Sequence, residues 1–159
     1  MILVDSSSWI HFLRPNGDLV VRARVEATLA NGEACWCPLV RLELWNGASG
    51  DRDRKILRDF ENVLPELAID DEVWTTACEL ARRARAAGIS VPATDVLIVA
   101  CARRHGAGVE TADSDFERLA TVVPIAMYTP ERIAEFQGES EVDLDTRAAA
   151  RDELKRADD

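Results

Sequence analysis

Long apolar runs are missing from this chain of 159 residues. The longest, residues 96–102, is far shorter than the roughly 20 apolar residues that a membrane-spanning helix needs. The opening Met-Ile-Leu-Val-Asp has neither a basic segment nor a small-residue cleavage site, so it does not resemble a secretory signal peptide. We therefore expect a cytoplasmic protein without membrane contact, in which the four cysteines are thiols rather than disulfides.

The side-chain patterns of several common catalytic sites are also missing. His11 and His105 are the two histidines, and no serine lies in a nucleophile elbow, which argues against a Ser-His-Asp hydrolase. Cys35 and Cys37 fall on a predicted strand without a second Cys/His pair at zinc spacing, so we interpret them as core residues. The glycines at 106–108 precede a strand and lack the Gly-Lys-Ser/Thr of a phosphate loop.

A surplus of basic side chains is absent as well. Lys and Arg number 19 against 29 Asp and Glu, for a formal net charge of −10. Proteins that bind nucleic acid without sequence preference usually carry the opposite balance. The charge is uneven, however: residues 139–159 contribute −4, and arginine clusters lie at 52–58, 82–85 and 103–104. A positive rim around an acidic centre is compatible with this total, so charge alone decides nothing about partners.

Short apolar segments alternate with helical patterns along the rest of the chain. The apolar segments predict strands at 2–4, 34–37, 108–111 and 122–128. Helices are predicted to begin near Trp9 with a cap from residues 6–8, at Asp18, after Pro38, at residue 51, at Asp70 or Asp71, at Thr94-Asp95, at Ser114 and at Thr129-Pro130. This alternation predicts an α/β fold with a small parallel sheet and helices on both of its faces.

The composition changes near the C-terminus. Beyond Gly138 the sequence is dominated by Glu, Asp, Arg and Ala and lacks a broad apolar face. We predict one domain over residues 1–137, followed by a polar tail over 138–159 that is either helical or disordered.

Five carboxylates stand where a site could form. Asp5 follows the first predicted strand, Asp113 and Asp115 follow the strand at 108–111, Asp95 opens the most apolar helix, and Glu43 lies in an apolar context. Ligand sites of open α/β sheets form at the carboxyl ends of the strands. Taken singly, each residue has an ordinary structural explanation: a helix cap for Asp5 and Asp95, a solvent-facing side chain for Glu43, and a turn for the other two.

Taken together, the carboxylates indicate a cation site. Carboxylates within ~5 Å of one another repel by ~3 kcal/mol per pair at an effective dielectric constant of ~20. Such a cluster needs protonation or a cation, and oxygen ligands alone suit Mg²⁺ or Mn²⁺ rather than zinc. Ser7 adds a hydroxyl that could contact a metal-held water or a phosphate oxygen. Carboxylate-bound Mg²⁺ keeps water positions open, which suits hydrolysis of a phosphodiester.

The acidic residues also lie in motifs of a known family. The motifs are Ile-Leu-Val-Asp5-Ser-Ser-Ser-Trp-Ile, Arg41-Leu-Glu43-Leu, Thr94-Asp95-Val-Leu-Ile-Val-Ala and Thr111-Ala-Asp113-Ser-Asp115-Phe116. With these, residues 1–136 resemble PIN-domain endoribonucleases, in particular VapC-type toxins of bacterial and archaeal toxin–antitoxin pairs. The resemblance implies a PIN-like three-layer fold and a Mg²⁺-dependent, or Mn²⁺-dependent, endoribonuclease.

The resemblance also implies roles for these residues. Asp5, Glu43, Asp95 and Asp113 would form the acidic quartet, with Asp115 as an accessory acid. Asp5 and Asp95 would bind the metal directly, while Glu43 and Asp113 would help to hold or orient water. The arginine clusters would then contact the RNA backbone. The implied assembly is a homodimer inhibited by a cognate VapB-type antitoxin, as a heterotetramer or larger, with an antitoxin helix in an apolar groove.

Two other functions remain open at this stage. One is an acidic metal-binding module of the same fold that does not turn over a substrate. The other is a nuclease acting on DNA or flaps, against which the short chain argues, because it leaves little room for an arch or clamp. A phosphoacceptor function is disfavoured, because Asp5 is followed by three serines rather than by the second aspartate of aspartyl-phosphate phosphatases.

Overall fold

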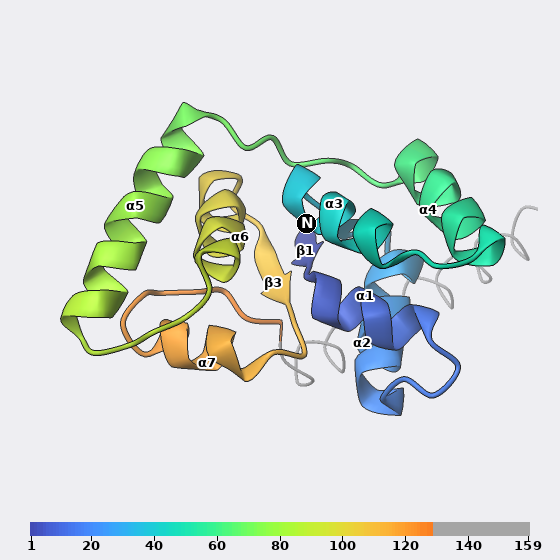
Figure 1. Ribbon diagram of the computed structural model, residues 1–159, viewed down its shortest axis with the longest axis horizontal. Helices are drawn as coiled ribbons and strands as arrows, with labels where there is room; N and C mark the ends of the chain where they lie inside the picture. Colours follow the sequence, from blue (N-terminus) through green and yellow to red (C-terminus); the bar gives the residue numbers. More distant parts are fainter. Residues whose placement is uncertain (129–159) are drawn as a thin grey trace, which may run out of the picture. The chain divides into compact units, whose positions relative to one another are not determined.

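The sheet is built around the first strand of the chain. The computed structural model of the protein describes residues 1–128 (Figure 1). β1 (Ile2–Val4) lies between β2 (Ala34–Cys35) and β3 (Gly108–Glu110), and both neighbours run parallel to it. Every residue of the three strands is buried, as expected for a parallel sheet that is covered on both faces.

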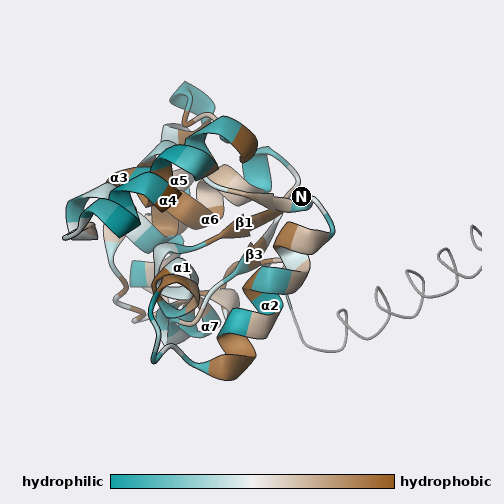
Figure 2. Ribbon diagram, turned by 90° about the vertical axis from the view of Figure 1, so that its right-hand side faces the viewer, coloured by the Kyte–Doolittle hydropathy of each residue, from teal (hydrophilic) through white to brown (hydrophobic). Residues whose placement is uncertain are grey.

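Helices follow each strand and enclose the sheet. They are α1 (Ser6–Leu13), α2 (Leu19–Ala30), α3 (Pro38–Gly47), α4 (Asp51–Val63), α5 (Asp71–Ala86), α6 (Ala93–Arg104) and α7 (Ser114–Ala120). α2 contacts β2 and α6 contacts β3. These two helices lie on opposite sides of the strands (Figure 2). The predicted α/β fold, a small parallel sheet flanked by helices, is confirmed.

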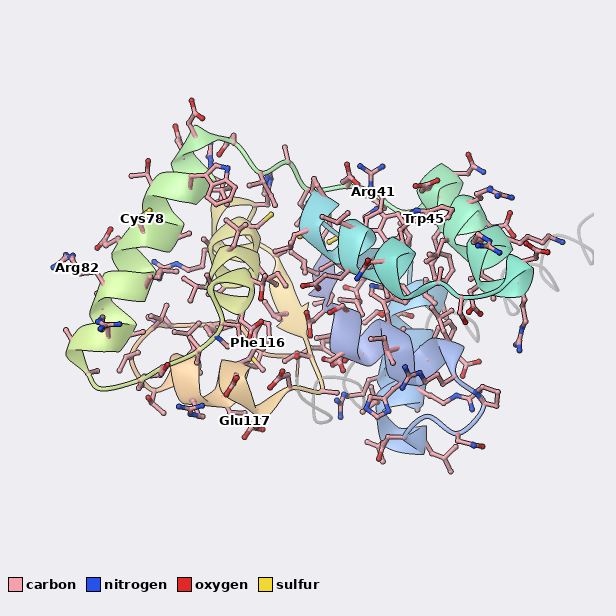
Figure 3. All side chains as sticks on the ribbon, viewed as in Figure 1. Arg41, Trp45, Cys78, Arg82, Phe116 and Glu117 are labelled. Carbon is pink, nitrogen blue, oxygen red and sulfur yellow. The ribbon has the colours of Figure 1, made fainter. Side chains whose placement is uncertain are left out.

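α6 forms the centre of the core because it has no polar side between residues 96 and 102. All seven of these residues are buried. α5 packs against α6 through Val73, Ala77, Leu80 and Ala84, which recur at helical spacing. The opposite side of α5, with Cys78 and Arg82, faces outward (Figure 3). Within residues 1–128, no helix combines the length and the apolar character needed to cross a membrane.

The cysteines behave as predicted. All four are free, and Cys35, Cys37 and Cys101 are buried while Cys78 is exposed. Cys35 lies in β2, and Cys37 precedes the first residue of α3. Their interpretation as core residues is therefore confirmed.

Two predicted helix starts, those of α1 and α6, are wrong by one or more residues, and the helix predicted at Ser114 begins there but with a different cap. α1 begins at Ser6 with Asp5 as its N-cap, so the serines at 6–8 are not the cap. α7 likewise has Asp113 as its N-cap in place of Ser114. In both, the carboxylate accepts from the backbone N–H two residues ahead, at 3.2 Å and 2.9 Å respectively. α6 begins at Ala93 after Pro92, so Asp95 lies within its first turn rather than at the cap.

The fourth predicted strand, at 122–128, does not form. One parallel bridge joins Val109 to Met127, supported by hydrogen bonds from Val109 N to Ala126 O and from Tyr128 N to Val109 O, both 2.8 Å. Pro124 has no N–H to donate to a longer ladder. The helix predicted at Thr129, the domain boundary at residue 137 and the tail at 138–159 lie outside the described residues.

Candidate metal centre

Asp5 is held at the carboxyl end of β1 by hydroxyl groups from two other elements. Its backbone N–H donates to Glu110 O at 2.8 Å, which fixes it beside the end of β3. The side chain is 4% exposed. Ser7 Oγ donates to Asp5 Oδ2 at 2.6 Å, and Thr111 Oγ1 donates to the same oxygen at 3.1 Å. Since these bonds all reach Oδ2, they orient the carboxylate, and within residues 1–128 no hydrogen bond occupies Oδ1.

The same two hydroxyls also fix the loop after β3. Ser7 Oγ accepts from Ala112 N at 3.1 Å, and Thr111 Oγ1 accepts from Asp113 N at 3.0 Å. The start of α1 and the start of α7 are thereby tied to each other across the strand ends. Ser7 was predicted to lie at the site, but as a group facing water or phosphate. Thr111 was missed, although its hydroxyl directly follows a buried strand.

Three other carboxylates lie together near Asp5, whose charge acts on Asp95 although Asp5 is not itself one of the group. Asp95, Asp113 and Asp115 each offer one oxygen, and these oxygens lie within 4.8 Å of one another. They come from the first turn of α6, the N-cap of α7 and the first turn of α7. Asp95 Oδ1 accepts from Thr94 Oγ1 at 3.2 Å, whereas Asp95 Oδ2 is buried and has no hydrogen-bond partner among residues 1–128.

The electrostatics of this group favour a bound cation. Burial raises the pKa of Asp95 to about 6, and the charges of Asp5, Asp113 and Asp115 act in the same direction. Arg118 forms an ion pair with Asp115 at 2.7 Å but is itself half exposed. A divalent cation would reverse the balance, because it favours the ionised form of every carboxylate near it. An oxygen-only donor set with one buried, unpartnered oxygen fits a hard ion of the Mg²⁺ type.

Glu43 lies in a different position from these acids. It is in the second turn of α3, five residues and about 7.5 Å along the helix from Pro38. Its carboxylate is not among the oxygens that lie within 4.8 Å of one another. It lines a pocket of about 300 Å³ together with Ile10, Arg14 and Leu57. Its role at the metal therefore stays a prediction.

Comparison with known proteins identifies the family. Residues 2–122 match the PIN domain family. The chain belongs to the PIN domain family. Ribonuclease VapC11 of Mycobacterium tuberculosis is 34% identical over 125 residues, which cover 77% of this chain and 93% of that protein. Ribonuclease VapC18 of the same species is 32% identical over 123 residues, or 75% of this chain and 87% of that protein.

A solved structure supports the fold of this PIN domain. DNA-bound VapBC from Salmonella typhimurium matches with a TM-score of 0.66 and 20% identity, over 80% of this chain and 96% of that one. FitAcB from Neisseria gonorrhoeae matches with a TM-score of 0.64 and 21% identity, over 82% and 98%. The family resemblance inferred from the four motifs is thus confirmed.

A buried ion pair lies at the end of β3, immediately before Thr111 in the chain of this PIN domain. Glu110, the last residue of β3, is 1% exposed and is paired with Arg24 of α2 at 2.9 Å. Ser8 Oγ donates to Glu110 Oε1 at 3.2 Å. Neither Arg24 nor Glu110 was predicted to matter, although an acid inside an apolar strand sequence was a usable signal.

Proposed function

We propose that this PIN domain is a metal-dependent endoribonuclease that hydrolyses RNA phosphodiester bonds as the toxin of a toxin–antitoxin pair. The observation that carries the proposal is the buried Asp95 Oδ2, which has no hydrogen-bond partner in the described part of the chain and is acted on by the charges of Asp5, Asp113 and Asp115. The relatives that match most of this chain are named VapC ribonucleases, and the match extends over most of their own length.

The proposed ligands are the oxygens that other residues leave available. Asp5 Oδ1 and Asp95 Oδ2 would hold Mg²⁺, with Mn²⁺ as the alternative ion, and Asp113 and Asp115 would complete the negative field. The bound ion would stabilise charge on the phosphate and lower the pKa of a nearby water. Ser7 and Thr111 would keep Asp5 Oδ2 turned away from the ion. Glu43 is proposed, from the family resemblance alone, to orient water.

The proposed partner is a VapB-type antitoxin. Solved relatives of the fold are VapBC complexes, one of them from Salmonella typhimurium bound to DNA. An antitoxin that sends a basic side chain toward Asp95 and its neighbours would match the excess negative charge there. A homodimeric toxin, alone or in a larger assembly with the antitoxin, completes the proposal, and the cytoplasm is the compartment in which such a pair meets cellular RNA.

Cleavage of RNA by the purified protein tests the proposal. Wild type is compared with Asp5→Asn and Asp95→Asn in Mg²⁺ and in EDTA, with Asp59→Asn as the matched control because Asp59 is exposed on α4. We expect cleavage that needs Mg²⁺, survives Asp59→Asn and falls at least ~100-fold in the two site variants. Glu43→Gln is measured beside them and is expected to lose activity without losing Mg²⁺ binding.

Two results would contradict the proposal. Cleavage that persists in both site variants would place the activity outside this carboxylate group. A folded wild type that binds Mg²⁺ but cuts no RNA would support a metal-binding module without turnover, and cleavage of DNA alone would support the other nuclease class.

A further inference from the structure

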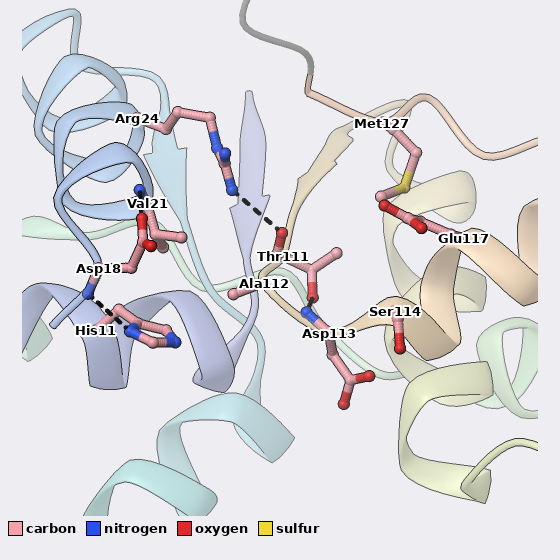
Figure 4. Close-up of a pocket in the computed structure, with 10 residues that line it drawn as sticks. All are labelled: His11, Asp18, Val21, Arg24, Thr111, Ala112, Asp113, Ser114, Glu117 and Met127. Atoms are coloured by element: carbon pink, nitrogen blue, oxygen red, sulfur yellow. Dashed lines mark hydrogen bonds between the residues drawn. The ribbon is translucent and has the colours of Figure 1, made fainter.

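A second feature adjoins the carboxylate group and is not explained by metal binding. A pocket of about 290 Å³ lies between the α1–α2 connection, the end of β3 and α7, and Asp113 borders it (Figure 4). His11, Asp18 and Arg24 stand on one side, with Glu117 and Met127 on the other. Its position beside Asp113 places any occupant next to the proposed metal.

The hydrogen-bonding state of His11 is fixed by the turn that follows α1. The backbone N–H of Asp18 donates to His11 Nδ1 at 3.0 Å. Since Nδ1 accepts this bond, the neutral ring carries its proton on Nε2. The imidazole therefore presents an N–H donor at the pocket, in a fixed orientation.

The charges around the pocket exclude a free anion as the preferred occupant. Three residues with carboxylates, Asp18, Asp113 and Glu117, line the pocket with a single guanidinium, and Arg24 already directs its Nε to Glu110. A phosphate group would be repelled by this surplus. A neutral ring with both donors and acceptors at its edge would instead find carboxylates to accept from it and the His11 N–H to donate to it.

The apolar part of the lining suits a flat ring. Met127 and Val21 contribute thioether and aliphatic surface at opposite sides of the pocket (Figure 4). Methionine sulfur packs favourably against aromatic rings. Proteins bind single-stranded RNA in this manner, with bases turned out of the strand, stacked on side chains and hydrogen-bonded along their edges.

We infer that this pocket binds the base of the nucleotide next to the scissile phosphate, with His11 and Glu117 contacting its edge. The inference rests on the proposed ribonuclease function and deepens it, because the pocket selects which phosphodiester reaches the carboxylates. His11 and Glu117 are specificity-determining residues in this assignment, whereas Asp5 and Asp95 are the residues at the reacting phosphate.

Sequencing of the cleavage ends tests the inference with two pairs of variants. Ala112→Leu adds bulk at a residue that lines the pocket, and Ala86→Leu, at the exposed end of α5, adds the same atoms elsewhere. His11→Gln removes the imidazole donor, and His105→Gln changes the histidine at the end of α6 instead. We expect Ala112→Leu and His11→Gln to weaken the base preference beside the cut and to raise KM roughly 5- to 150-fold, the range given by loss of one stacked base. The value of kcat should change far less.

The controls separate a base subsite from a structural role. Both control variants should keep the wild-type cleavage pattern and KM. A variant that only disturbed folding would lower the melting temperature without changing the preferred sequence. If wild type cleaves RNA and the two pocket variants, like the two controls, keep its base preference and KM, the inference is wrong and the ribonuclease function stands.

Titration with nucleosides keeps the inference testable if no RNA is cut. Adenosine, guanosine, cytidine, uridine and inorganic phosphate are added separately, in EDTA, to ¹⁵N-labelled protein. We expect at least one nucleoside to shift the amides of residues 112 and 114 in wild type and in Ala86→Leu but not in Ala112→Leu. That result without RNA cleavage would uphold the base pocket and overturn the proposed function. Shifts with phosphate alone, or with none of the five, would overturn the inference.

Discussion

The Nε of Arg24 donates to both carboxylate oxygens of Glu110, at 2.9 Å and 3.0 Å, at the point where β3 ends. Glu110 is 1% exposed, and burial raises its pKa while the Arg24 charge opposes that rise. The pair ties α2 to the strand from which Thr111 reaches Asp5. The buried Arg24–Glu110 ion pair therefore stabilises the end of β3, from which Thr111 holds Asp5 in place.

Replacing Arg24 should destabilise the folded protein more than replacing an arginine without a buried partner. Arg24→Met leaves Glu110 buried without its cation, which we expect to lower the free energy of unfolding by about 3–5 kcal/mol. Arg22→Met, two positions away on α2, is the matched control. Within residues 1–128 its side chain donates one hydrogen bond, to Pro15 O at 3.3 Å, so the change should cost under about 1 kcal/mol. Urea unfolding at neutral pH measures both.

A double variant separates pairing from packing. Arg24→Met with Glu110→Leu removes both charges, so most of the lost stability should return. If the double variant is as unstable as Arg24→Met, the loss arises from the methylene packing of Arg24 rather than from the unpaired carboxylate.

The raised pKa of Asp95 predicts a loss of stability as pH rises in the absence of divalent metal. The folded protein holds this proton up to about pH 6, whereas the unfolded chain releases it near the ordinary value of 3.8. The contribution is thus complete below pH 3.8 and is lost as pH rises through 6. Because the carboxyl is partly solvated, we expect a change of about 1–2 kcal/mol in unfolding free energy.

Unfolding in EDTA at pH 4.5 and pH 7.5 measures this change. Asp95→Asn cannot ionise, so it should lose less stability than wild type over the same interval and should be the more stable of the two at pH 7.5. Mg²⁺ at pH 7.5 should stabilise wild type and not Asp95→Asn, by linkage to the folded state. Equal pH dependence in both proteins would show that other groups carry the effect.

Ser7 is expected to act on metal affinity through Asp5. Ser7→Ala removes the 2.6 Å bond to Asp5 Oδ2 and the acceptor for Ala112 N, so the carboxylate can rotate. Loss of such a supporting bond typically weakens metal binding or activity 10- to 100-fold. The Mg²⁺ concentration for half-maximal cleavage should rise by about that factor. The Ser6 side chain makes no hydrogen bond within residues 1–128, so Ser6→Ala should need the same Mg²⁺ concentration as wild type. If Ser7→Ala also needed the wild-type concentration, Thr111 alone would be sufficient to hold Asp5.

Most helices and strands could be predicted from the sequence, because apolar periodicity and helix-capping or helix-breaking residues act locally. The helix predicted to begin at residue 51 does begin there, and the all-apolar stretch after Asp95 is the buried centre of the core. The strand predicted at 122–128 makes one described bridge to β3, and Pro124 within it has no N–H to extend the ladder. Apolar composition indicates burial, but it does not decide whether a ladder of backbone hydrogen bonds forms.

The carboxylates of the candidate site could be predicted from the sequence, but the residues that hold them in place could not. Asp5 and Asp113 are both helix caps and members of the acidic edge, so the structural and functional interpretations were never exclusive. Thr111 and Arg24 contact residues far away in the chain, and such pairs depend on strand register, which no single segment encodes. The β1–β3 register, with Val4 opposite Glu110, is what brings them together.

The turn after α1 permits no side chain at Gly17. A Cβ there would lie 1.8 Å from His11 O, a backbone atom that cannot move aside as a flexible side chain could. Gly17→Ala should therefore displace Asp18, which holds His11 Nδ1 and caps α2 through bonds to Val20 N and Val21 N. We expect a loss of about 1–3 kcal/mol, or roughly 3–10 °C in melting temperature. Gly47→Ala, at a helical position with open space, should be neutral or slightly stabilising.

Gly17→Ala should also affect the base preference in RNA cleavage, because His11 would lose its hydrogen bond from Asp18 N. We expect a weaker base preference at temperatures below the melting temperature of the variant. An unchanged preference would show that His11 keeps its orientation without Asp18.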